Sequence, residues 1–197
     1  FNPSQSWNQR ASIGLATESK GTYNAEMYYH RGTISEIDRG LKFRVHDTLG
    51  MVIDSSGRVT MPYQPAFVAT RNSDLTISTD VTITLDSEDF DVGNNYSTST
   101  SKFTAPVAGK YLFTFQASVN SMSTGLYNAV YFMVNGAGTG HRIRVTNPSS
   151  SNVWTGFNGS AIFNLGANDT VHLNSYANTG SYTIQANEAH FSGYLLG

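Results

Sequence analysis

Short runs in which apolar and polar residues alternate recur from residue 81 to the end of the chain, with turn residues between them. The runs are TITLD at 82–86, KYLFTFQASV at 110–119, AVYFMVNG at 129–136, HRIRVT at 141–146, AIFNLG at 161–166, DTVHLNSY at 169–176 and AHFSGYLL at 189–196. A two-residue period at this spacing is typical of strands in a sandwich or barrel. No window shows the 3.6-residue period of a helix, so the pattern predicts an all-β region.

Residues 1–61 have a sparser apolar pattern, which the turn sequences KGT, RGT, DRG and SSG interrupt. The segments GLKFRVHDT at 40–48 and GMVIDSSGRVTM at 50–61 nevertheless predict strands joined by turns. Because this region has too few large apolar residues for a core of its own, we expect its strands to pair with other chains in an intertwined shaft. A loosely ordered linker is the alternative.

The boundary between the two regions falls where Pro62 and Pro65 disfavour a central strand and predict an extended connector. We therefore predict one domain at 1–62 and a second at 63–197. The chain begins with Phe1 rather than Met, so we expect it to be the C-terminal piece of a longer polypeptide.

Composition excludes several functions. Charged residues are 13% of the chain and the formal net charge is −2, which is too little positive charge to hold a nucleic acid backbone. The absence of cysteine removes disulfides, thiol catalysis and thiolate metal sites. No run approaches the roughly 18 apolar residues that cross a bilayer, so we expect no membrane insertion.

One set of residues carries a family resemblance at its spacing. The set is Leu85, Asp91, Tyr96, Phe103, Gly109, Tyr111, Phe113 and Phe115. This pattern resembles the signature of the globular head of complement C1q, a family that shares the jelly roll of tumour necrosis factor (TNF). Only Leu85 departs from it, where the family has Phe, and an apolar core position tolerates that exchange. The resemblance covers residues 66–197 and implies a ten-stranded jelly-roll sandwich that forms a homotrimer.

Alternation along two strands separates core positions from candidate interface positions. After Gly109, the side chains of Tyr111, Phe113 and Phe115 share the face expected to fill the core, and Leu112 lies on the other face. In the closing strand, the residues expected to point inward are Phe191, Gly193 and Leu195. The resemblance implies that the outer face of these strands lines a threefold axis, which makes Leu112, Tyr194 and Leu196 candidates for the trimer interface. Ordinary exposure of single apolar residues is the alternative.

A second resemblance concerns MVIDSSGRVTMPYQPAF at 51–67, where 53–59 reads as strand, tight turn and strand with Gly57 available for positive φ. This run is similar to the segment that joins shaft and head in tail fibres of marine bacteriophages. It implies a receptor-binding fibre tip on the virion, outside the cell. Its partners would be upstream fibre or tail proteins and a host cell-surface polysaccharide or outer-membrane receptor.

Connectivity predicts where such a tip would bind. If consecutive strands alternate in direction, the loops at about 120–127, 147–153 and 178–188 share the far end, while the C-terminus and the turns at 136–140 and 166–168 share the other. The far loops combine amides and hydroxyls with aromatic rings, which suits a neutral sugar. Our candidate receptor-binding residues are Asn120, Ser123, Tyr127, Asn147, Ser150, Asn152, Trp154, Tyr176, Asn178 and Tyr182.

The sequence contains no pattern of catalytic residues, so we predict no enzyme. The five histidines have no HExxH spacing and no serine lies in a GxSxG elbow. The acidic cluster at 86–91 includes a faint calcium-loop pattern at 89–93, for which structural carboxylates are the preferred interpretation. We therefore expect no cofactor, with calcium as the open possibility. The alternatives to a receptor-binding tip are a structural cap or decoration, a glycan depolymerase with two carboxylates about 5–9 Å apart, and a C1q-like lectin outside any virus.

Overall fold

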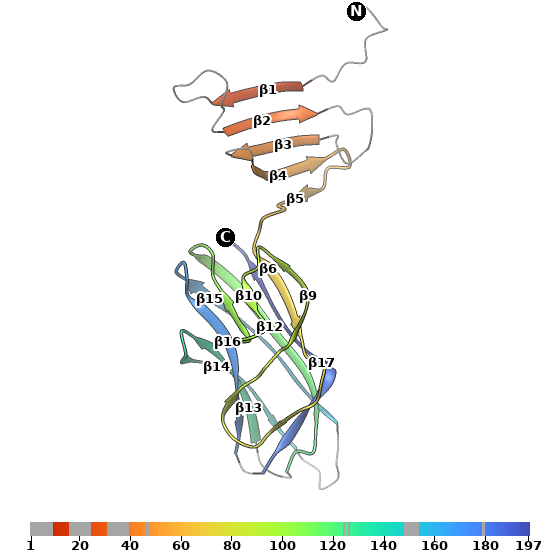
Figure 1. The fold of residues 1–197 in the computed structure, drawn as a ribbon, viewed down its shortest axis with the longest axis vertical. Coiled ribbons are helices and arrows are strands. Elements are labelled where there is room, and N and C mark those ends of the chain that lie inside the picture. Colours follow the sequence, from red (N-terminus) through yellow and green to blue (C-terminus); the bar gives the residue numbers. More distant parts are fainter. Residues whose placement is uncertain are drawn as a thin grey trace, which may run out of the picture. The chain divides into compact units, whose positions relative to one another are not determined.

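The computed structural model describes residues 10–15, 25–30, 40–45, 48–123, 125, 127–147, 154–178 and 180–197. The chain divides into two compact units, Phe1–Tyr63 and Gln64–Gly197, which we call the N-terminal and C-terminal units. This division lies one residue beyond the boundary that the prolines suggested. Every regular element within the described residues is a β-strand (Figure 1).

The N-terminal unit contains one five-stranded antiparallel sheet in chain order. Its strands are β1 (Arg10–Leu15), β2 (Ala25–His30), β3 (Gly40–Val45), β4 (Thr48–Asp54) and β5 (Val59–Thr60). Each strand pairs with its neighbour in the same chain, whereas the expected pairing with strands of other chains stays a prediction. Pairing between consecutive strands closes only short loops, which costs little chain entropy.

The turn between β4 and β5 has the form that its sequence predicted. Asp54 Oδ1 accepts hydrogen bonds from the backbone N–H groups of Ser56 (2.8 Å) and Arg58 (2.9 Å), and Gly57 has φ +79°. Hydrogen bonds from the Arg58 backbone and side chain hold the pKa of Asp54 below its usual value. An aspartate that opens a turn, followed by glycine at positive φ, explains why the chain reverses here.

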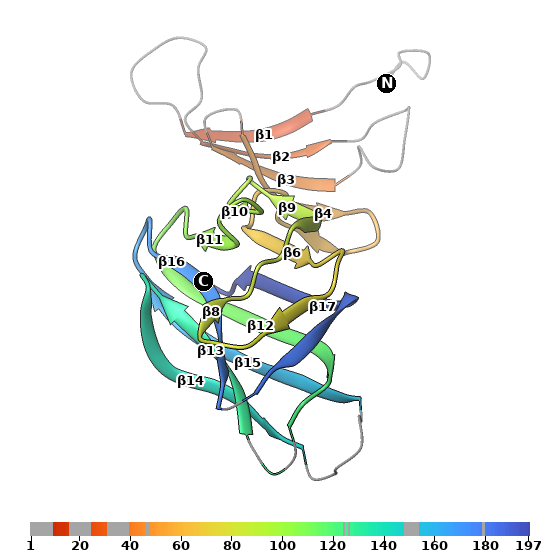
Figure 2. The same ribbon diagram turned by 60° about the horizontal axis from the view of Figure 1, so that its bottom comes forward.

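The C-terminal unit is a sandwich of two six-stranded antiparallel sheets (Figures 1 and 2). The β12 sheet has the order β15 (Thr155–Leu165), β12 (Gly109–Asn120), β17 (Tyr182–Leu195), β6 (Ala66–Thr70) and β9 (Ser87–Val92), with β7 (Leu75–Ile77) also paired to β17. The β13 sheet has the order β10 (Tyr96–Ser97), β11 (Lys102–Thr104), β16 (Thr170–Ala177), β13 (Tyr127–Val134) and β14 (Ala137–Thr146), with β8 (Val81–Thr82) also paired to β16.

The C-terminal unit has more strands than the ten predicted, because short paired segments such as β7, β8 and β10 are separate strands. The TITLD run is mostly outside the ladders, since of its residues only Thr82 lies in a strand. Ile83 and Leu85 are buried all the same, and the backbone N–H of Leu85 donates to Ser101 Oγ at 3.0 Å. The alternation at 82–86 therefore reports burial correctly but not strand pairing.

The core between the sheets follows the predicted alternation. Tyr111, Phe113 and Phe115 are fully buried, and so is Phe191 on β17. Gly193 faces the same core, where an added Cβ would lie 2.5 Å from a carbon of Phe67 and 2.7 Å from one of Phe113. Phe67 on β6 and Phe113 on β12 are the register partners of Gly193 on the two flanking strands, so glycine at this position leaves room for both rings in the core.

Candidate functional site

Three connections meet at one end of the C-terminal unit, which we call the loop end. They join β12 to β13, β14 to β15 and β16 to β17. The strand register places the residues next to these connections side by side, since Asn120 pairs with Thr183 and Val119 with Thr155. A backbone hydrogen bond from Gly125 N–H to Asn147 O (2.9 Å) joins the first two connections.

The opposite end holds the start and the finish of the unit. Leu195 N–H donates to Pro65 O at 3.0 Å and Lys110 N–H donates to Gly197 O at 2.7 Å, so the C-terminus returns to the residues through which the chain enters the unit. The turn that follows β13 lies at this end too, where Asn135 Nδ2 donates to Asp169 Oδ1 at 2.8 Å. The predicted separation of loops and termini is therefore confirmed within the C-terminal unit.

The exposure of the predicted loop residues differs widely. Trp154 is 57% exposed, as a ring that contacts a ligand must be. Tyr182 is fully buried against Phe157, with ring centroids 5.6 Å apart, so the prediction that it offers a stacking face is wrong. It is the first residue of β17 rather than a loop residue, and the inward register of that strand turns its ring into the core.

Other predicted residues support the loops themselves. Asn147 is 3% exposed and its Nδ2 donates to Met122 O at 2.8 Å, so the prediction that its amide meets a ligand is also wrong. Ser123 lies against Gly180, whose φ is +75°. Asn120 Oδ1 accepts a hydrogen bond from Ser121 Oγ at 3.1 Å. Ser150 and Asn152 lie outside the described residues.

Tyr127 and Tyr176 lie together on the outer face of the β13 sheet, next to the loop end. Their rings stack with centroids 5.5 Å apart, and Tyr176 Oη donates to Asn178 Oδ1 at 3.2 Å. The hydrogen bond with Tyr127 raises the pKa of Tyr176. Two members of this group, Tyr131 and Arg144, were not among the predicted residues. Tyr131 is four residues after Tyr127 on β13 and Arg144 is two residues after Arg142 on β14, so each pair shares a strand face, which was the available signal.

The predicted interface residues lie on the outer face of the β12 sheet. Tyr194 and Leu196 are 46% and 48% exposed, and Leu112 is half-buried beside Tyr194, its register partner. Leu112 is also opposite Ile162 on β15, which is 56% exposed. Ile162, Leu112 and Tyr194 are therefore neighbours on β15, β12 and β17, and we call them the apolar row. Ile162 was not among the predicted interface residues. Alternation within AIFNLG was the signal that could have identified it.

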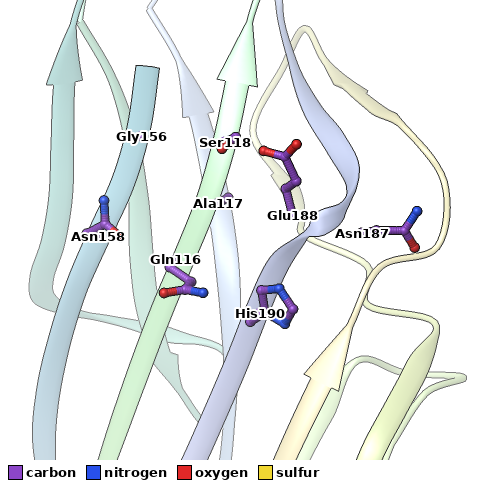
Figure 3. Close-up of a pocket in the computed structure, with 8 residues that line it drawn as sticks. All are labelled: Gln116, Ala117, Ser118, Gly156, Asn158, Asn187, Glu188 and His190. Carbon is purple, nitrogen blue, oxygen red and sulfur yellow. The ribbon is translucent and has the colours of Figure 1, made fainter. Parts of the chain in front are cut away.

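A polar cavity of about 340 Å³ opens on the same outer face, where the β12–β17 register shifts between Ala117 and Val119 (Figure 3). Residues from three strands and the β17 irregularity line it. They are Gln116, Ala117, Ser118, Gly156, Asn158, Asn187, Glu188 and His190. Glu188 is the single carboxylate in this lining, whereas hydrolysis of a glycosidic bond uses a pair.

Carboxylates of the acidic cluster at 86–91 hold local structure. Asp91 Oδ2 accepts the backbone N–H of Tyr96 at 2.8 Å, and Asp86 Oδ1 accepts that of Asn72 at 2.9 Å. Much of the cluster lies on β9, an extended strand, and not in the loop that the calcium-like pattern suggested. Within the described residues, no group of three or more His, Asp or Glu side chains could hold a metal ion. The described part of the chain also has no helix of the length and apolarity that crossing a membrane requires.

The similarity to known proteins covers almost all of the C-terminal unit. The C1q domain model matches residues 66–196. The globular domain of zebrafish complement 1qA superposes with a TM-score of 0.55 at 22% identity, over 68% of this chain and 98% of that one. Murine APRIL superposes with a TM-score of 0.52 at 10% identity, over 68% of this chain and 99% of that one. No curated protein matches the sequence. With its core, its strand order and its family match in agreement, the chain belongs to the C1q domain family.

Proposed function

We propose that this chain is the receptor-binding end of a bacteriophage tail fibre and acts without catalysis. In this proposal the C-terminal unit forms a homotrimeric head on the virion and binds a host cell-surface polysaccharide or an outer-membrane receptor, while upstream fibre proteins attach it to the tail. The observation that carries the proposal is the gathering of three connections at the loop end, opposite the end where the chain enters and leaves the unit.

The apolar row on the β12 sheet supports the trimer. Ile162, Leu112 and Tyr194 are neighbours across three strands and form a continuous outward surface. Contiguous exposed apolar residues of this kind are typical of protein interfaces, whereas scattered ones are not. A trimer built on this face leaves the loop end free.

The N-terminal sheet supports a fibre segment. On one set of alternate positions, Leu41 pairs with Ile53 and Phe43 with Met51. These four side chains are only half-buried within the unit. An apolar face on a single-layer sheet gains stability when copies of the chain pack their faces together. The tail-fibre assignment itself depends on the similarity of residues 51–67 to segments that join shaft and head.

The cavity on the β12 sheet gives no support to a depolymerase, because Glu188 has no second carboxylate in the lining. A cap that only trimerises the fibre would need the apolar row and not the exposed ring of Trp154. Binding to cells therefore discriminates between a receptor-binding tip and a cap.

Replacing Trp154 by Ala is expected to reduce cell binding at least about tenfold, because buried aromatic anchors dominate binding energy at interfaces. The measurement uses the fluorescently labelled 197-residue chain on a panel of bacterial strains, followed by titration on the strains it labels. Tyr63→Ala is the matched control, since Tyr63 is 66% exposed and lies outside the loop end.

Unchanged cell binding by Trp154→Ala would contradict a receptor site at the loop end and indicate that the receptor binds elsewhere on the chain. If the unmodified chain labels no strain, the receptor-binding function is rejected in favour of a cap.

A further inference from the structure

The outer face of the β13 sheet carries a cluster of aromatic rings and one arginine, and ligand binding at the loop end does not explain their arrangement. We call it the tyrosine cluster and define it as Tyr127, Tyr131, Tyr176 and Arg144. Tyr176 contacts Tyr127 in a stack and Tyr131 edge-on, with ring centroids 5.5 Å and 6.5 Å apart. The Arg144 guanidinium carbon lies 4.2 Å from the centroid of the Tyr127 ring.

The strand register explains why these side chains converge. Ala129 on β13 is opposite Arg144 on one side and Tyr176 on the other. It faces outward but is fully buried, because its methyl group leaves room for the larger side chains to close over it. The cluster is therefore built on three adjacent strands, which fix its geometry better than a loop could.

Arg144 is held by an aromatic ring rather than by an acid. It has no carboxylate partner within the described parts of the chain, and neither does its exposed neighbour Arg142. A guanidinium over a ring face gains cation–π energy and is restrained in position. Its N–H donors make no hydrogen bond with the described residues, so they are available to an incoming acceptor.

The polar groups around Arg144 indicate the chemical class of the ligand that would supply this acceptor. The stacked rings of Tyr127 and Tyr176 bring two phenol groups to this site, and the hydrogen bond from Tyr176 Oη to Asn178 Oδ1 adds an amide beside them. A guanidinium binds a carboxylate through two parallel hydrogen bonds, while phenol and amide groups bind hydroxyls. A carboxylate-bearing sugar offers both kinds of acceptor on one ring.

We propose that the tyrosine cluster is a binding site for an acidic sugar residue, with Arg144 contacting its carboxylate and Tyr127, Tyr176 and Asn178 contacting its hydroxyls. This inference rests on the proposed glycan-binding function and changes its ligand class from neutral to acidic. It also places a contact on the side of the unit, next to the loop end.

The test compares two probes with the same sugar backbone, in one of which methyl esterification neutralises every carboxylate. Calorimetric titration of the full 197-residue chain uses trigalacturonate and its fully methyl-esterified form. The acidic form is expected to bind at least about tenfold more tightly, as the loss of a charge-assisted hydrogen bond predicts. Arg144→Gln is expected to remove this difference and leave the melting temperature unchanged.

Arg142→Gln is the matched control, because it removes the same charge from the same strand and face. It is expected to retain most of the preference for the acidic form. An equal loss in both variants would show diffuse charge attraction and overturn the site. Displacement of trigalacturonate by an equal concentration of inorganic phosphate would show a bare anion site and overturn the assignment to a sugar.

Equal binding of both probes, or binding of neither, also overturns the proposal. The receptor function is judged separately, because cell binding that depends on Trp154 would stand even if the acidic sugar site failed. Loss of cell binding in Arg144→Gln, together with loss of the acidic preference, would support both.

Discussion

Replacing Leu112 by Asp is expected to convert the proposed trimer into single chains at micromolar concentration. Leu112 is the centre of the apolar row, opposite both Ile162 and Tyr194. In a trimer built on this face, the substitution buries an unpaired carboxylate in each of three copies, and each burial costs several kcal/mol. Light scattering should then report the chain mass of 21.4 kDa.

Val107→Asp is the control for this substitution, since Val107 is 47% exposed and lies outside the apolar row. It should leave the assembly unchanged. The circular dichroism signal of the sheets should also persist in Leu112→Asp, because the outward side chain does not contribute to the core. A Leu112→Asp protein with the trimer mass would exclude this face as the interface.

Replacing Tyr182 by Ala is expected to lower the free energy of unfolding by about 3–5 kcal/mol, the usual range for truncating a buried aromatic side chain. The ring is fully buried against Phe157, and burial holds the pKa of Tyr182 well above its usual value. Its loss leaves a cavity where β17 begins. Urea unfolding at matched chain concentration measures the change, since assembly contributes to apparent stability.

Trp154→Ala provides the contrast, because an exposed ring contributes within about 0.5 kcal/mol to stability. Both aromatic residues lie at the loop end. A large loss of stability in Tyr182→Ala but not in Trp154→Ala would therefore distinguish a residue that supports the fold from one that is free to bind a ligand. If Tyr182→Ala were as stable as the unmodified chain, the assignment of Tyr182 to the core would be wrong.

The sequence predicted the core because core residues follow strand periodicity. Six of the eight residues that carry the family resemblance are buried aromatic or aliphatic side chains: Leu85, Tyr96, Phe103, Tyr111, Phe113 and Phe115. Asp91 Oδ2 accepts the backbone N–H of Tyr96, and a Cβ at Gly109 would lie 2.8 Å from Leu195 Cδ1 and 3.1 Å from the backbone oxygen of Gly197. The pattern therefore encodes packing, which explains why it predicts the fold and is silent on the ligand.

The sequence was less informative near the loop end, where strand boundaries decide exposure. Tyr182 falls within the loop expected at about 178–188, but it is the first residue of β17. This strand begins seven residues before the alternating run at 189–196, and within a strand the register decides whether a side chain faces solvent or core. Arg144 and Tyr131 were missed for the opposite reason. They belong to regular strands, and only the register with β16 shows that they meet Tyr127 and Tyr176.

The N-terminal unit shows a similar limit. Alternation predicted strands at 40–48 and 50–61, and β3, β4 and β5 lie there. It could not decide which strands pair, because hydrogen bonding between backbones is the same within and between chains. Packing of the sheet's apolar face against other copies, and pairing of its edge strands β1 and β5 with theirs, both stay predictions.

The role of the apolar row as an interface depends on assembly into a trimer, and so does the proposed fibre tip. Light scattering on the unmodified 197-residue chain, measured across a range of micromolar concentrations, tests it most directly. We predict a constant mass three times that of the 21.4 kDa chain. A stable mass of one chain throughout this range would contradict the trimer and, with it, the proposed fibre tip.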